Sequence, residues 1–147
     1  MIKVLLVDDH ASVRKSLSVM LETTEDILVI ATASNGVEAI DHARQYCPDV
    51  AVVDISMPLM DGIEATRQIR ALCRHTRILM LSILDSPEYV QRALEVGAAG
   101  FVLKDAIAKD LLAAVRSLAV GKRYFSQKIA EIAEKYTNQR SNDSWAG

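Results

Sequence analysis

Short runs of consecutive apolar residues, each followed by an amphipathic segment, recur along the chain. The runs span Ile2–Val7, Ile27–Ala33, Val50–Val53, Arg77–Ser82 and Phe101–Leu103. They do not alternate between apolar and polar residues, which is typical of parallel strands covered on both faces. The segments between them repeat apolar residues every three or four positions, as amphipathic helices do. Five β-then-α units predict an α/β fold: a five-stranded parallel sheet between two layers of helices.

Residues that cap helices stand where most of these helices should begin. Asn35 and Asp61 are predicted N-caps of the second and third helices, and Asp105 of the fifth. Ser86 is a predicted cap of the fourth helix, with Pro87 in its first turn. We therefore expect a defined amino end for each of these helices.

The fourth helix has a thin apolar face. Val90, Ala93 and Leu94 are the main apolar residues that can anchor it. Few buried contacts allow local opening at low free energy, so this helix is predicted to be the most mobile of the set.

The pattern of the sheet ends near Gly121. Residues 1–121 are predicted to form one domain, and 122–147 to form a helix from Ser126 followed by a polar run, Thr137–Asp143, with no means of burying itself. Tyr124 and Phe125 could be a partner surface, but packing against this last helix is favoured.

Composition is that of a soluble globular protein. The chain has 147 residues, 50% hydrophobic, with a formal charge of -2. No apolar run approaches the roughly 20 residues that span a bilayer, and the amino terminus is too soon acidic for a signal peptide, so no membrane contact and a cytoplasmic location are expected.

Cys47 and Cys73 lie in predicted helix ends without metal-ligand spacing. Reduced structural thiols are therefore expected, rather than a disulfide or a nucleophile.

Polar residues follow four of the five predicted strands. Asp8 and Asp9 follow the first, Asp54 the third, Ser82 ends the fourth and Lys104 follows the fifth. Any one of them alone is better explained as an ordinary strand end, but parallel strands bring their carboxyl ends to one edge of the sheet, where such folds keep their sites. Crowded carboxylates repel one another unless a cation lies among them, and Mg²⁺ prefers oxygen ligands of this kind.

These residues together carry a resemblance to a known family. Asp8-Asp9, Asp54 with Met57-Pro58 and Asp61-Gly62 behind it, Ser82, and Phe101–Asp105 resemble the receiver domain of two-component response regulators, from Ile2 to about Gly121. The resemblance implies a flavodoxin-like sheet with strand order 2-1-3-4-5. Lys104-Asp105 and Gly121–Phe125 resemble the NarL/FixJ (LuxR-type) class. With Asp105 in place of the more widespread proline, the bond after Lys104 is expected to be trans.

The resemblance implies a phosphoryl acceptor and a metal site. Asp54 would accept the phosphoryl group from a histidine kinase or a small acyl phosphate. Asp9, Asp54 and the backbone carbonyl of Ser56 would bind Mg²⁺ directly, and Asp8 would hold a coordinated water. The chain would then be a switch, with magnesium-dependent self-phosphorylation and slow self-dephosphorylation as its only catalysis.

The resemblance also implies a switching mechanism. Lys104 would pair with the phosphoryl oxygens, and Ser82 would move to hydrogen-bond them. Phe101 stands where the family keeps an aromatic residue that turns inward behind the moving hydroxyl. Ser56 and Leu84 flank the site and would tune the lifetime of the phosphoryl group.

Partners follow from the same resemblance and from charge. We expect a histidine kinase, a homodimer strengthened by phosphorylation, and DNA contact only through an output domain beyond Gly147, to which 122–147 would be the linker. The chain itself has 17 basic against 19 acidic residues, and its nearest basic cluster, Lys122-Arg123, is too small to bind DNA.

Other functions fit the residues less well. A phosphatase with an aspartate nucleophile of the haloacid-dehalogenase type would need a second acid at Ser56. A nucleotide or flavin module would want a glycine- or hydroxyl-rich loop where Asp8-Asp9-His10 stands. A stand-alone or non-phosphorylated receiver that acts as a protein-interaction module is the remaining alternative.

His10, His42 and His75 are interpreted as surface or helix residues, with His10 notable for its acidic neighbours.

Overall fold

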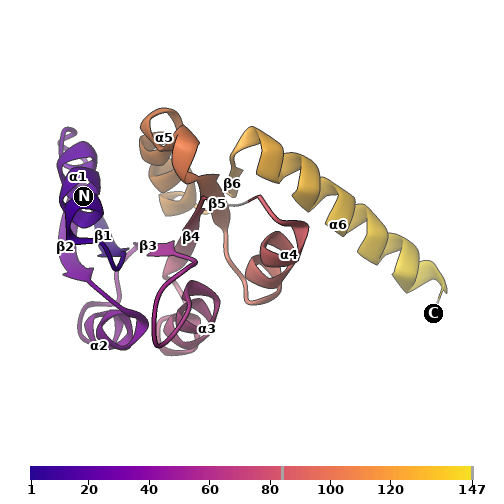
Figure 1. The fold of residues 1–147 in the computed structure, drawn as a ribbon, viewed down its shortest axis with the longest axis horizontal. Helices are drawn as coiled ribbons and strands as arrows, with labels where there is room; N and C mark the ends of the chain where they lie inside the picture. Colours follow the sequence, from indigo (N-terminus) through magenta and orange to yellow (C-terminus); the bar gives the residue numbers. More distant parts are fainter. Residues whose placement is uncertain (84, 147) are drawn as a thin grey trace.

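A six-stranded parallel sheet forms the centre of the protein (Figure 1). The computed structural model describes residues 1–83 and 85–146, with the side chains of 137–146 left out of the description. The strands are β1 (Ile2–Val7), β2 (Ile27–Ala33), β3 (Val50–Asp54), β4 (Arg77–Ser82), β5 (Gly100–Leu103) and β6 (Tyr124–Phe125), in the order β2-β1-β3-β4-β5-β6. The expected order of the first five strands is confirmed.

The sixth strand was not predicted. Tyr124 and Phe125 pair in parallel with Gly100 and Phe101, so the sheet, and not only the last helix, holds them. A Cβ on Gly100 would lie 2.9 Å from the backbone oxygen of Tyr124, so glycine permits this close approach. Two residues are too few to show a strand periodicity, and the sequence pattern therefore missed them.

Helices cover both faces of the sheet (Figure 1). They are α1 (Ala11–Leu21), α2 (Gly36–Tyr46), α3 (Gly62–Leu72), α4 (Pro87–Glu95), α5 (Ile107–Ala119) and α6 (Gln127–Ala146), with a 3-10 turn, η1 (Lys104–Ala106), before α5. One buried cluster joins alternate sheet residues to α1 and α5, and the other joins the remaining sheet residues to α2, α3 and α4. In the described part of the chain, none of these helices has the length and apolar character to cross a membrane.

Helix caps agree with the sequence in part. The side chains of Asn35 and Asp61 each accept a hydrogen bond of 2.9 Å from the backbone N–H three residues later, as predicted. Ser86 makes no capping hydrogen bond through its side chain. Asp105 lies inside η1, and the N-cap of α5 is Ala106. The expectation for Asp105 was wrong because the chain leaves β5 through a 3-10 turn before the α-helix begins. The peptide bond after Lys104 is trans, as expected.

Helix α6 packs beside α4 and then runs away from the body of the molecule (Figure 1). Ile129 is fully buried and Ala133 nearly so, in the part of α6 closest to the sheet. The backbone stays helical to Ala146, so the expected polar tail continues the helix, while the burial of its side chains from Thr137 on lies outside the described residues. The packing of the domain therefore continues past Gly121.

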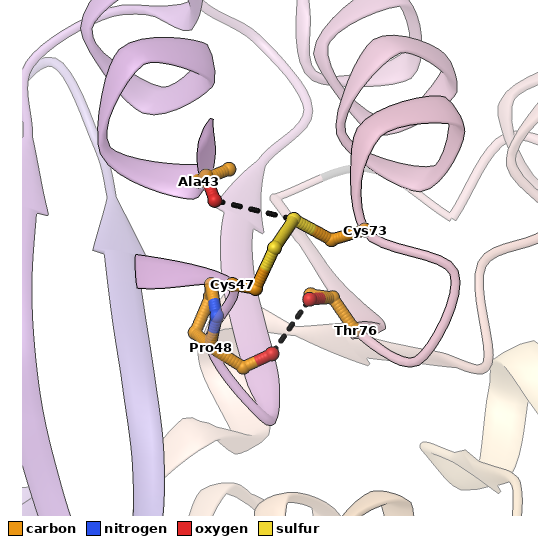
Figure 2. The surroundings of a disulfide bond; sticks show 5 residues. All are labelled: Ala43, Cys47, Pro48, Cys73 and Thr76. Carbon is orange, nitrogen blue, oxygen red and sulfur yellow. Dashed lines mark hydrogen bonds between the residues drawn. A yellow bond between two sulfur atoms is a disulfide. The ribbon is translucent and has the colours of Figure 1, made fainter. Parts of the chain in front are cut away.

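Cys47 and Cys73 form a disulfide (Figure 2). The expectation of reduced thiols is corrected here. Cys47 follows α2 and Cys73 follows α3, two neighbouring helices on one face of the sheet, and their Cα atoms are 5.6 Å apart. Their separation of 26 positions hides this proximity from the sequence.

Candidate functional site

The carboxyl ends of β1, β3 and β5 bring an ammonium group between carboxylates. Asp8 follows β1, Asp54 ends β3 and Lys104 follows β5. The Nζ of Lys104 lies 3.0 Å from Oδ2 of Asp8 and 3.3 Å from Oδ2 of Asp54. The side chain of Asp8 is fully buried and that of Asp54 is 5% exposed, whereas that of Lys104 keeps 20% of its surface. The cation therefore closes the site from the solvent side.

Backbone N–H groups hold the second oxygen of each carboxylate, the one that does not contact Lys104. Oδ1 of Asp54 accepts a hydrogen bond of 3.2 Å from the N–H of Ser56, and Oδ1 of Asp8 accepts one of 2.9 Å from the N–H of His10. Each carboxylate thus has one oxygen held by its own loop and the other directed to Lys104. These contacts fix the orientation of both carboxylates.

Burial and the charge of the neighbouring partner act in opposite directions on the pKa of Asp54 and on that of Lys104. Burial raises the pKa of Asp54, and the nearby charge of Asp8 adds to the rise, while Lys104 opposes both. Burial also disfavours the charged form of Lys104, but its hydrogen bond to Asp8 and the charges of Asp54 and Asp8 raise its pKa on balance. Lys104 therefore stays cationic, and one ammonium does not fully offset the carboxylates around it.

Asp9 and His10 complete a set of groups that could hold a cation. One ligand atom each from Asp8, Asp9, His10 and Asp54 lie within 4.8 Å of one another. Oδ1 of Asp9 is buried and has no hydrogen-bond partner among the described residues, although Nδ1 of His10 approaches it to 3.1 Å. A buried carboxylate oxygen without a partner costs free energy, which a divalent cation would recover. The three carboxylates of this set are therefore consistent with Mg²⁺ binding.

His10 lies at the exposed side of the site, and its position directly after two acids was the sequence signal for this. It was interpreted as a surface residue, and its ring is indeed 67% exposed, yet Nδ1 also lies 3.4 Å from Oδ1 of Asp8.

A family model describes this constellation. The model of the response regulator receiver domain matches residues 4–116. The chain belongs to the response regulator receiver domains. It is 37% identical over 143 residues to the oxygen regulatory protein NreC of Staphylococcus epidermidis, and this alignment includes 96% of the chain and 66% of NreC. The chain thus spans just under two thirds of the length of that relative.

Solved structures place the receiver in the NarL/LuxR type. The receiver superposes on a LuxR-family response regulator from Aurantimonas sp. SI85-9A1 with a TM-score of 0.87 and 34% identity, covering 93% of this chain and 99% of that one. The signal receiver domain of the response regulator NarL from Mycobacterium tuberculosis gives a TM-score of 0.78 and 35% identity, with 82% and 98% covered. Both matches agree with the expected class.

The loop after β3 lines one side of the site in this receiver. A Cβ on Gly62 would lie 2.3 Å from the backbone oxygen of Asp54, so glycine lets α3 begin directly against the end of β3. Asp61 caps α3 through Oδ1, and its Oδ2 lies 4.0 Å from the guanidinium of Arg92 in α4. A hollow beside Asp9 is lined by this loop and by Tyr89 and Arg92. Sequence reasoning did not find those two residues of α4.

The predicted switch residues lie on neighbouring strands. Ser82, at the end of β4, is 1% exposed, and Phe101, in β5, is also 1% exposed. Phe101 belongs to the buried cluster that contains Val90 of α4 and Ile129 of α6. Ser56 is an exposed residue beside Asp54, and Leu84 lies outside the described residues. The structure thus joins the site to α4 and α6 through one continuous core.

Proposed function

We propose that this receiver is a phosphorylation-controlled switch in which Asp54 is the phosphoryl acceptor. The observation that carries the proposal is the position of Lys104, whose ammonium touches the buried carboxylates of both Asp54 and Asp8, beside the unpartnered oxygen of Asp9. Phosphoryl transfer asks mainly for positioning and for neutralisation of charge on the transferred oxygens. These four side chains supply both.

In the proposed reaction a carboxylate oxygen of Asp54 attacks the phosphorus of a phosphohistidine or a small acyl phosphate. The new O–P bond forms as the bond to the donor breaks, and the donor leaves with the electron pair. The N–H of Ser56 holds one oxygen of Asp54 in place. Lys104 then pairs with the phosphoryl oxygens, since it already lies at that end of the side chain.

We assign magnesium to the acids around Asp54. Asp9, Asp54 and the backbone carbonyl of Ser56 would hold the ion, and Asp8 would orient a coordinated water. When bound, the ion supplies positive charge to the phosphoryl oxygens. Asp8 has a second task in this arrangement, because its hydrogen bond keeps Lys104 directed into the site.

We further propose that Ser82 moves to hydrogen-bond the phosphoryl group, and that Phe101 follows inward. The adjoining core contains Val90, so the change would reach α4 as a shift in population between two packings. Ser56 and Leu84 would tune how long the phosphoryl group survives.

The donor would be a sensor histidine kinase, and the phosphorylated form would dimerise. A groove between α1 and α5 is lined by apolar side chains that include Val13, Leu17, Met20 and Ile107, and Val19 on α1 is 63% exposed. Such a surface can be covered by a second copy. The protein would work in the cytoplasm, where histidine kinases present their phosphohistidine.

DNA contact is proposed for an output domain linked through residues 122–147. Within this chain, Arg70, Arg77 and Arg123 line one hollow at the opposite edge of the sheet from Asp54, a cluster that the sequence did not reveal. Three arginines are fewer than the roughly 6–10 phosphate contacts of typical DNA-binding domains. The chain alone is therefore expected not to bind DNA.

Self-phosphorylation and slow self-dephosphorylation would be the only catalysis by this chain. A non-phosphorylated receiver that only binds partners is the competing function. It predicts no covalent phosphate on Asp54 under any condition, which separates the two.

The test is intact-mass spectrometry after incubation with acetyl phosphate and Mg²⁺. Wild type should gain one phosphoryl group, and Asp54→Asn should gain none while keeping its fold by circular dichroism. Asp41→Asn, an exposed position in α2, is the matched control and should be labelled as wild type is. Equal labelling of the Asp54→Asn variant, or no labelling of wild type, would refute the assignment.

A further inference from the structure

We propose that Cys47 and Cys73 form a reversible thiol–disulfide site, with Cys47 as the sulfur that exchanges with small disulfides and thiols and Cys73 as the resolving cysteine. The disulfide lies where α2 and α3 end (Figure 2). Asp54 lies at the other end of this layer, where β3 ends and leads into the loop before α3. The inference does not rest on phosphorylation.

The two cysteines differ in exposure. Cys47 is exposed, whereas Cys73 is only 4% exposed. A hollow lined by both cysteines and by Pro48, Asp49 and His75 opens beside them. Exposed disulfides are the ones that exchange with external thiols. An incoming thiolate therefore reaches the Sγ of Cys47, and Cys73 becomes the leaving sulfur.

The surroundings also accommodate the reduced state. The Sγ of Cys73 lies 3.2 Å from the backbone oxygen of Ala43, in position for a thiol to donate a hydrogen bond (Figure 2). A disulfide sulfur has no hydrogen to donate, so this contact becomes a hydrogen bond only after reduction. A buried thiol at position 73 therefore has an acceptor waiting.

A second hydrogen bond keeps the two cysteines together when the disulfide opens. The hydroxyl of Thr76 donates to the backbone oxygen of Pro48 at 2.6 Å (Figure 2). The next residues are joined too, because the N–H of Arg77 donates to the oxygen of Asp49 at 3.0 Å. The chain around each cysteine is thus tied to that around the other without the sulfurs. Opening does not disperse the thiols, and the bond can form again.

Reduction proceeds by two exchanges. The thiolate of a small thiol attacks the Sγ of Cys47; the new S–S bond forms as the Cys47–Cys73 bond breaks, and Cys73 leaves with the electron pair and takes a proton. A second thiolate attacks the external sulfur of this mixed disulfide, releases Cys47 as a thiolate that takes a proton, and leaves as a small disulfide. Two electrons and two protons reach the protein. Oxidation is the reverse, with a small disulfide as oxidant.

The consequence for the fold lies in α2 and α3. The oxidised form ties the carboxyl ends of the two helices, which removes conformations from the unfolded chain. The amino ends of α2 and α3 meet near Asp54, at the other end of this layer. There, a Cβ on Gly36 would touch the side chain of Met60 in the loop before α3. Reduction is therefore expected to loosen the packing of α2 against α3, beginning at their carboxyl ends, which the disulfide joins.

The first test follows the state of the two cysteines in wild type. The protein is equilibrated in glutathione buffers from fully reduced to fully oxidised, quenched by alkylation and weighed. The reduced form should carry two alkyl groups and the disulfide form none, and the share of the disulfide form should rise and fall reversibly with the buffer. After reduction, alkylation of the native protein should label Cys47 at least about tenfold faster than Cys73. A share that no buffer changes would overturn the proposal.

The second test traps the intermediate. With oxidised glutathione, Cys73→Ser should accumulate one glutathione adduct, on Cys47, while Cys47→Ser should remain largely unmodified. Serine at position 73 keeps a donor for Ala43, so folding should be preserved. Wild type should melt at a temperature roughly 10 °C lower when reduced, with faster hydrogen exchange at the carboxyl ends of α2 and α3. Equal adducts on both variants, or identical exchange in the two redox states, would count against the assigned roles.

Discussion

The Nζ of Lys104 lies 3.3 Å from Oδ2 of Asp54, although Asp54 ends β3, Lys104 follows β5, and β4 lies between these two strands. The contact reaches across the end of β4, beside Ser82. Together with the 3.0 Å contact to Asp8, it leaves three carboxylates, those of Asp8, Asp9 and Asp54, with one ammonium. The metal-free site is therefore short of positive charge.

Removing that ammonium should destabilise the metal-free protein. Lys104→Met keeps the length of the side chain but leaves two buried carboxylates without a cation. The expected cost is about 3 kcal/mol in the free energy of unfolding, at the lower end for a buried ion pair because the Lys104 side chain is partly exposed. Urea unfolding in the presence of a chelator measures it. Lys109→Met, at an exposed position of α5, should change stability little. A variant at 104 as stable as wild type would mean that the ion pair contributes nothing.

Magnesium should stabilise the receiver through Asp9. The unpartnered oxygen of this residue is expected to gain a ligand, so the melting temperature should rise with Mg²⁺, by the equivalent of about 2.7 kcal/mol at 100 times the dissociation constant. Asp9→Ala should remove most of this rise, and Asp41→Ala none. If Asp9→Ala responds as wild type does, the ion binds elsewhere.

The amino-terminal part of α6 should behave as part of the receiver core. Ile129 is fully buried, so Ile129→Ala should cost about 2–5 kcal/mol in the free energy of unfolding. Lys128→Ala, the exposed neighbouring residue, should cost little. Denaturant unfolding of both variants makes the comparison. Equal stabilities would show that α6 is only a linker that leaves the domain at Gly121.

Alkaline pH should weaken one contact between β6 and α5. The hydroxyl of Tyr124 donates to Oδ1 of Asp110 at 2.7 Å. This hydrogen bond and burial raise the pKa of Tyr124 from 10.0 to about 12. The folded protein holds this proton more tightly than the unfolded chain does, so the stabilisation is present below pH 10.0 and is lost as the pH rises to about 12.

The measurement is the free energy of unfolding between pH 9 and 12, taken as roughly the range in which tyrosine titrates. Tyr124→Phe should be less stable than wild type by no more than about 1 kcal/mol at neutral pH, because the tyrosine is partly solvated. The difference should shrink toward the upper end of the range. Tyr46→Phe, at an exposed tyrosine, should follow the wild-type curve, and a difference that stays constant would exclude the linkage.

A phosphoryl mimic should be felt first in α4. Beryllofluoride bound at Asp54 is expected to draw Ser82 toward it and to repack the cluster shared by Phe101 and Val90. Hydrogen exchange should therefore change across α4 and β5, and less across β1 and β2. Asp54→Asn should show no response to the mimic. Unchanged exchange in α4 of wild type would rule out this route.

Much of the fold and of the site was predictable because its signals are local. A strand buried on both faces must be continuously apolar, and such runs revealed β1 to β5 with nearly the observed bounds. In a parallel sheet all carboxyl ends meet at one edge. The sequence therefore determined that Asp8, Asp54 and Lys104 would gather, before any distance was known.

Only the tertiary structure decided which distant segments contact one another, because the local sequence pattern of one segment does not indicate its partner. The pairing of Tyr124 with Gly100, the place of Ile129 in the core and the disulfide of Cys47 with Cys73 are of this kind. Hydrophobic periodicity reports which face of an element is buried, but not which neighbour covers it. That choice depends on how the elements pack in space, and the packing alone brings these residues together.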